Sequence, residues 1–139
     1  IMAIHPAVEA MFRAFALPSK RERLVTIFGN PRRRRRALDD LNHSNLWDPR
    51  YARAIDGWEG SVLEALRAAG APATCHVISG TEDLDGREMP LEEAVEACEA
   101  FSFASIVCCI PGELAFFWDE ESAPRDRFLL CRPRERVAR

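Results

Sequence analysis

The sequence from Thr74 to Ile110 reads TCHVISGTEDLDGREMPLEEAVEACEAFSFASIVCCI and decides the fold class. It begins with a run of strand length, Thr74–Ser79, and it ends with another, Ala104–Ile110. Between the two runs, Leu91–Ala100 carries apolar side chains at helical spacing on one face. This order predicts a strand, a helix and a strand joined as a right-handed parallel crossover. Because Ala104–Ile110 is apolar on both faces, we expect it to be a central strand covered on both sides.

The segment before this unit is predicted to be helical. Helices are expected to start near Pro6, directly after Pro18 and at Pro31, and a fourth is expected to end at Gly70. In the first of them, apolar residues recur at the spacing of one helix face. Leu38 and Leu41 are expected to point inward from the third.

The segment after the unit adds two more strands, Glu113–Asp119 and Asp126–Cys131. The links around them are short, which favours antiparallel pairing. The sequence therefore predicts an α+β fold with a helical N-terminal third packed on a mixed four-stranded sheet. The expected element order is α-α-α-α-β-α-β-β-β. Residues 1–139 are expected to form a single domain, with a helical subregion over 1–58 and an α/β subregion over 59–139.

The composition is that of an ordinary globular domain, with 139 residues, 47% hydrophobic and 29% charged. No run approaches the roughly 20 apolar residues that a membrane helix needs, and we see no secretion signal. The five cysteines are an odd number without a C-x-x-C pair, which favours free thiols in a reducing compartment. We therefore expect a cytoplasmic protein without a membrane partner. Lys20 is the only lysine, and the arginine-rich composition suggests a bacterial source.

The charges are segregated along the chain. Residues 1–58 carry 11 basic and 6 acidic side chains, residues 59–122 carry 2 and 14, and residues 123–139 carry 6 and 2. An acidic middle between two basic ends can attract the ends of its own chain or those of a second copy. The formation of a homo-oligomer is therefore one of the possibilities.

Four of the acidic residues are crowded into the loop Gly80–Pro90. This loop is expected to follow a parallel strand and precede a helix, which is where open α/β sheets bind ligands. Its carboxylates repel anions, so we expect it to bind a basic protein segment or a cationic ligand. Its spacing matches a calcium-binding loop only in part, and no metal or other cofactor is expected. The expected binding residues are Glu82, Asp83, Asp85, Arg87 and Glu88.

The run Arg32–Arg36 is the strongest local signal in the basic first half. Five consecutive helical residues sweep more than a full turn, so at least one arginine should point toward the protein and need a carboxylate. Pairing with the acidic middle of the chain is the favoured interpretation. Contact with nucleic acid is the less favoured alternative, because no aromatic residues that could stack on bases lie among the arginines.

The sequence assigns no catalytic residue. It has no P-loop, no G-x-G-x-x-G, no G-x-S-x-G and no H-E-x-x-H. The histidines, His5, His43 and His76, lie far apart along the chain, and no spacing predicts that they converge. A site assembled near His43, with Asp48 and Arg50, is the enzymatic alternative.

The favoured function is therefore a small, non-enzymatic interaction or regulatory protein. It would bind a basic or cationic partner through its acidic surface. A nucleic-acid-binding protein that uses the Arg32–Arg36 helix and an enzyme with a site near His43 are the two alternatives.

Overall fold

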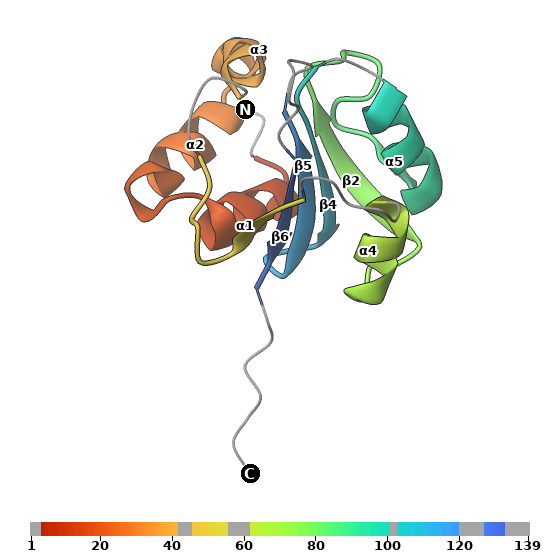
Figure 1. Cartoon of the computed structure of the whole chain (residues 1–139). Coiled ribbons are helices and arrows are strands. Elements are labelled where there is room, and N and C mark those ends of the chain that lie inside the picture. The colour runs from red at the N-terminus through yellow and green to blue at the C-terminus, as the bar shows by residue number, and fades with distance from the viewer. Residues whose placement is uncertain (1–3, 42–45, 56–61, 101–102, 120–126, 133–139) are drawn as a thin grey trace.

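The structure, a computed structural model, describes residues 4–41, 46–55, 62–100, 103–119 and 127–132. In these residues one six-stranded sheet lies between two layers of helices (Figure 1). Its strand order is β1-β6-β5-β4-β2-β3, and every neighbouring pair is antiparallel. The strands are β1 Ala52–Ala54, β2 Thr74–Ser79, β3 Glu88–Pro90, β4 Ser105–Ile110, β5 Leu114–Trp118 and β6 Arg127–Cys131. The helices are α1 Pro6–Phe15, η1 Pro18–Lys20, α2 Arg21–Phe28, α3 Pro31–Asp40, α4 Val62–Ala68 and α5 Leu91–Ala100.

The first helical layer consists of α1, α2 and α3 and covers one face of the sheet. Pro6 occupies the first turn of α1, where its missing N–H costs nothing. Val8, Met11, Phe12 and Phe15 are at most 1% exposed and belong to the core between this layer and the sheet. Both Leu38 and Leu41 are buried, as expected. The helical N-terminal third therefore packs on the sheet.

Trp47 fixes the chain between the helical layer and β1. Its backbone forms an isolated antiparallel bridge with Ala16. Its ring is 6% exposed and lies 6.4 Å from the Phe12 ring and 5.3 Å from the Phe117 ring. The aromatic contacts hold the segment before β1 against both α1 and the sheet.

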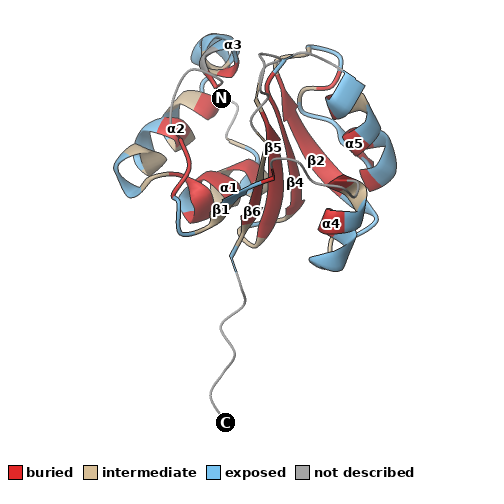
Figure 2. Ribbon diagram, in the orientation of Figure 1, coloured by how far each residue is buried: buried red, intermediate tan, exposed pale blue. Residues whose placement is uncertain are grey.

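The second layer, α4 and α5, covers the opposite face. Leu91, Ala94, Val95 and Cys98 are buried, so α5 presents the apolar face that its sequence predicts. β4 lies between β5 and β2, and its side chains alternate between the two cores, which confirms the expected central strand. Figure 2 shows buried residues along the strands and exposed residues on the outer faces of the helices.

The predicted parallel crossover is wrong. β2 pairs antiparallel with β4, from His76↔Cys108 to Ser79↔Ser105. The loop after β2 contains a three-residue strand, β3, which folds back antiparallel on the other side of β2. The chain therefore reverses direction once more before it enters α5. As a result α5 joins β3 to β4, which both run against β2, rather than joining β2 to β4.

The predicted four-stranded mixed sheet is also wrong in size and type. The four expected strands are β2, β4, β5 and β6, and their observed bounds agree to within a residue. The two strands that the sequence did not reveal, β1 and β3, are three residues long and form the edges of the sheet. Edge strands this short carry too few residues for a period of two to appear. In the described part of the chain, no helix has the length and apolarity needed to cross a membrane.

Candidate functional site

The five predicted binding residues all belong to the β2–β3 hairpin. Its turn is anchored by Leu84, which is buried, and closed by a hydrogen bond from the Gly86 N–H to the Val77 carbonyl at 2.8 Å. Gly86 adopts a positive φ of 79°, a conformation that glycine reaches without steric cost. Asp83 and Arg87 are exposed, and neither side chain contacts another charged side chain in the described residues.

Asp85 is held by an arginine of α3. The Arg34 guanidinium donates two hydrogen bonds to the Asp85 carboxylate, at 3.1 and 2.7 Å. The Ser79 N–H donates a third, at 3.1 Å. The side chains of Arg34 and Asp85 are only 23% and 19% exposed, so this bidentate pair is partly shielded from water. The nearby pair of Arg35 and Glu82, 3.0 Å apart, is largely exposed.

The arginine run therefore divides into two sets. Arg34 and Arg35 face the hairpin, which confirms that part of the run points inward and meets a carboxylate. The other three, Arg32, Arg33 and Arg36, are exposed and have no charged partner within the described residues. Pairing with the chain's own acidic middle accounts for two of the five side chains.

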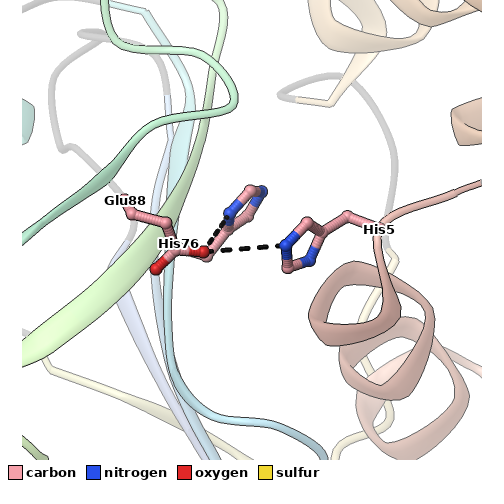
Figure 3. Close-up of side chains that lie close together, drawn as sticks. All are labelled: His5, His76 and Glu88. Atoms are coloured by element: carbon pink, nitrogen blue, oxygen red, sulfur yellow. Dashed lines mark hydrogen bonds and ion pairs between the residues drawn. The ribbon is translucent and has the colours of Figure 1, made fainter.

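The fifth predicted residue, Glu88, lies beside two histidines (Figure 3). Glu88 and His76 are cross-strand partners in β3 and β2, so their side chains leave the sheet on the same face. That face carries the α1–α3 layer, and His5 approaches from the start of α1. His76 Nδ1 lies 2.9 Å from Glu88 Oε1, and His5 Nε2 lies 3.6 Å from the same oxygen. The two imidazole rings are stacked, 4.0 Å apart and 17° from parallel.

The two histidines have different surroundings. His76 is 6% exposed, and burial lowers its pKa despite the opposing effect of the Glu88 hydrogen bond, so its ring is neutral at pH 7. His5 caps α1, because its Nδ1 accepts a hydrogen bond from the Ala7 N–H at 3.1 Å. A neutral His5 ring therefore carries its proton on Nε2, the nitrogen nearest Glu88.

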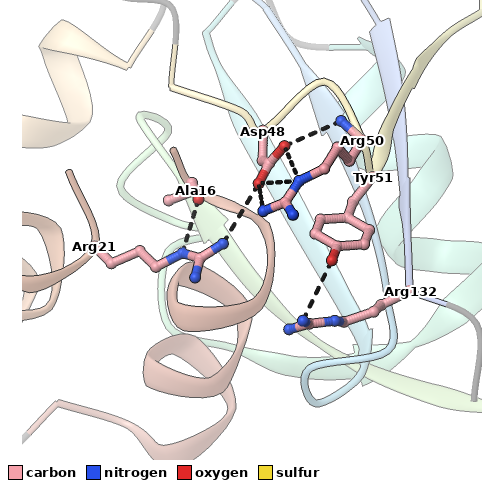
Figure 4. Close-up of polar contacts among 6 residues, drawn as sticks. All are labelled: Ala16, Arg21, Asp48, Arg50, Tyr51 and Arg132. Atoms are coloured by element: carbon pink, nitrogen blue, oxygen red, sulfur yellow. Dashed lines mark hydrogen bonds and ion pairs between the residues drawn. The ribbon is translucent and has the colours of Figure 1, made fainter. Parts of the chain in front are cut away.

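A second polar group surrounds Asp48, at the base of the Trp47 segment (Figure 4). The buried Asp48 carboxylate accepts three hydrogen bonds from the Arg50 guanidinium, at 3.1, 3.2 and 2.7 Å. Arg21 lies 3.5 Å away, and Tyr51 contacts the guanidinium groups of Arg50 and Arg132. The hydrogen bonds from Arg50 lower the pKa of Asp48 to about 2.

This group contains two members of the alternative enzymatic site near His43, and that alternative stays a prediction. Asp48 and Arg50 neutralise each other, so neither is available as an acid or a base near pH 7. His43, the third member of that hypothesis, lies outside the described residues.

Three of the four buried cysteines are not activated as nucleophiles. All five are free thiols, and four are buried. Burial raises the pKa of Cys75 to about 12 and raises the pKa values of Cys108 and Cys109 as well. A thiol with a raised pKa stays protonated and unreactive at neutral pH.

Sequence reasoning therefore identified Glu88 but missed His5 and His76 as its neighbours. Only the hairpin pairing and the packing of α1 bring them together, because 71 residues separate the two histidines along the chain. Comparison with protein-family models, with curated proteins and with solved structures finds no match to this chain.

Proposed function

We propose that this protein is a non-enzymatic binding protein that holds a cationic ligand at the β2–β3 hairpin. The observation that carries the proposal is the state of Glu88. Its side chain is 62% exposed, and its nearest partners, His76 and His5, are imidazoles rather than permanent cations. Glu88 therefore keeps a negative charge that no arginine neutralises in the described structure.

The other carboxylates of the hairpin support this assignment in two ways. Asp83 is exposed on the same turn without a charged partner in the described part of the chain, so it adds to the field of Glu88. Glu82 and Asp85 pair with α3 and hold the turn in place. The four carboxylates of the predicted site thus divide into two pairs: Asp83 and Glu88 would bind the ligand, and Glu82 and Asp85 would hold the turn in place.

The test compares two double variants with equal changes of charge. Asp83→Asn with Glu88→Gln neutralises the hairpin, and Glu93→Gln with Glu96→Gln neutralises two exposed carboxylates of α5 on the opposite face. Binding of a fluorescent penta-lysine peptide is measured by anisotropy at about 0.1 M ionic strength. We expect the hairpin variant to bind more weakly by about tenfold and the α5 variant to bind normally, since exposed charges act within about 10 Å. Equal weakening in both variants would show a net-charge effect and contradict a hairpin site.

A second candidate function is binding of a polyanion by the outer face of α3. The observation in its favour is that Arg32, Arg33 and Arg36 are exposed and unpaired in the described part. The elements α1, η1, α2 and α3 together carry nine basic and four acidic residues, so the whole layer is cationic. Nucleic acid is the polyanion that such a surface fits best.

This candidate is tested with a 20-mer DNA duplex and a matched pair of triple variants. Arg32, Arg33 and Arg36 are changed to Gln in one. Three exposed arginines outside the α1–α3 layer are changed to Gln in the control: Arg53, Arg67 and Arg87. If α3 contacts phosphates, only the first variant should lower the slope of log K against log salt, by about three. No measurable DNA binding by the unchanged protein would exclude this function.

A further inference from the structure

The group His5, His76 and Glu88 has the composition of a transition-metal site. Imidazole nitrogens and carboxylate oxygens bind zinc and its neighbours in the first transition row. Two histidines and one carboxylate leave a coordination position open for water or a ligand. The three ligand atoms lie within 4.8 Å of one another. At Zn–N and Zn–O distances of about 2.1 Å, tetrahedral ligand atoms lie about 3.4 Å apart, so the group is close to the required size.

The scaffold under the group is rigid on one side and adjustable on the other. His76 and Glu88 are paired across two hydrogen-bonded strands, and the His76 side chain is only 7% exposed. His5 is 45% exposed and precedes α1, so its ring can turn without disturbing the core. A metal site needs at least part of its ligand set held in advance, and β2 and β3 supply that part.

Two adjustments are required for a metal ion to bind. His76 Nδ1 donates its proton to the Glu88 carboxylate, so the ring must carry its proton on Nε2 instead before Nδ1 can coordinate. The ring of His5 must also change its orientation. The lone pair of an imidazole nitrogen lies in the plane of its ring, so two stacked rings cannot both point at one ion. The ring of His5 must therefore rotate out of the stack. Coordination through Nε2 also moves the ring proton to Nδ1, and Nδ1 then no longer accepts the Ala7 N–H. Metal binding and the capping of α1 compete for the same ring.

We propose that His5, His76 and Glu88 bind a divalent transition-metal ion, with zinc as the best fit. This rests on the proposed function, because it names the cation that the hairpin holds. Metal binding at this site would also affect the start of α1. The ion links the β2–β3 hairpin to the first turn of α1 and removes the His5 cap from that turn.

The experiment uses the full-length chain without a histidine tag and stripped of metal by a chelator. Cobalt(II) is titrated first, because its visible absorption reports the number and type of ligands, and zinc is then used to displace it. Each ligand is removed in turn by His5→Asn, His76→Gln and Glu88→Gln. Asn at position 5 keeps a good helix cap and removes only the imidazole, and Asp83→Asn is the control carboxylate on the same turn.

We expect one cobalt ion per chain with a four-coordinate spectrum. Loss of any one ligand should weaken binding by about 100-fold or more, and Asp83→Asn should leave it unchanged. Amide hydrogen exchange at Ala7 should become faster when the native protein binds metal. In the His5→Asn variant it should stay slow both with and without added metal. The exposed variants His5→Asn and Glu88→Gln decide the matter if His76→Gln fails to fold.

Any of three results would overturn the inference. The first is that cobalt and zinc do not bind. The second is that they bind to His5→Asn and Glu88→Gln as tightly as to the unchanged protein, and the third is that they bind without any effect on amide exchange at Ala7. If metal fails while penta-lysine still binds at the hairpin, the metal site is wrong and the proposed function stands. If both probes fail, both proposals are wrong.

Discussion

At the scale of single residues, the four hairpin carboxylates differ more in their partners than in their chemistry. Asp85 accepts two hydrogen bonds from Arg34 and one from a backbone N–H, and Asp83 accepts none in the described structure. A sequence pattern treats them as equivalent members of an acidic loop. The structure pairs Asp85 with Arg34 and leaves Asp83 exposed, and the binding role of Asp83 stays a proposal.

This difference predicts the effect of two conservative substitutions. Asp85→Asn should lower the free energy of unfolding by about 1–3 kcal/mol, because the charged hydrogen bonds to a partly buried arginine are lost. Asp83→Asn should change it by less than about 0.5 kcal/mol, as for other exposed sites. Urea unfolding of the two variants checks both values. Equal stabilities would mean that the Arg34 pair contributes nothing.

A second prediction at this scale concerns acid. Because the pKa of Asp48 is about 2 in the folded protein, against about 3.9 in an unfolded chain, its carboxylate stabilises the fold above pH 4. That contribution should disappear as the pH falls from about 4 to about 2. Urea midpoints measured across this range should fall more steeply for the native chain than for Asp48→Asn. The same dependence of the urea midpoint on pH in both proteins would contradict a lowered pKa of Asp48.

At the scale of elements, the turn between β2 and β3 has the largest consequence for the fold. It reverses the chain within the segment that sequence patterns classify as one polar loop. The reversal makes the pairing of β2 with β4 antiparallel, where a parallel pairing was expected within a mixed sheet. It also places Glu88 opposite His76, and so creates the candidate site.

The turn depends on the backbone conformation of Gly86. Gly86→Ala should destabilise the protein by about 1 kcal/mol, because a left-handed conformation strains a residue with a Cβ atom. An added Cβ would meet no atom within 4 Å, so the cost is conformational rather than steric. Gly86→Asn is the matched variant and should cost less, since Asn tolerates this region better. Thermal unfolding measures both, and an Ala variant as stable as the native chain would disprove the strain.

At the scale of the whole molecule, the sheet separates charges of opposite sign. The α1–α3 layer carries nine basic and four acidic residues, and α4 and α5 carry one basic and five acidic. The two candidate binding functions nevertheless use neighbouring surfaces on one face of the sheet. The cationic ligand would bind at the hairpin beside His5 and His76, and a polyanion would bind on the outer face of α3.

The same arrangement predicts how stability is distributed. β4 contacts both α1 and α5, so its amides should exchange with solvent only through global unfolding. The edge strands β1 and β3 should open locally and exchange at least about tenfold faster. Hydrogen exchange followed by NMR measures this directly. Equal protection of β3 and β4 would indicate that the hairpin is part of the central cooperative unit.

Local apolar spacing was enough to predict the elements whose residues repeat with a clear period. The helices α1, α3 and α5, the strands β2, β4, β5 and β6, and the buried faces of α1 and α5 all follow from local apolar spacing. The same reasoning showed that the five arginines could not all face solvent, because the helical repeat of 3.6 residues forbids it. It also named Glu88 as a binding residue, which stays a prediction.

Tertiary structure alone decided the direction of the strands, the two edge strands and the site. Strand direction depends on how many times the chain reverses, and one turn of a few residues around Gly86 changes the outcome for the whole sheet. The group of His5, His76 and Glu88 needs a cross-strand register and the docking of α1, which are set by packing between segments distant in sequence. Local periodicity contains no information on such contacts, because each is fixed by the burial of the two cores rather than by its own neighbours.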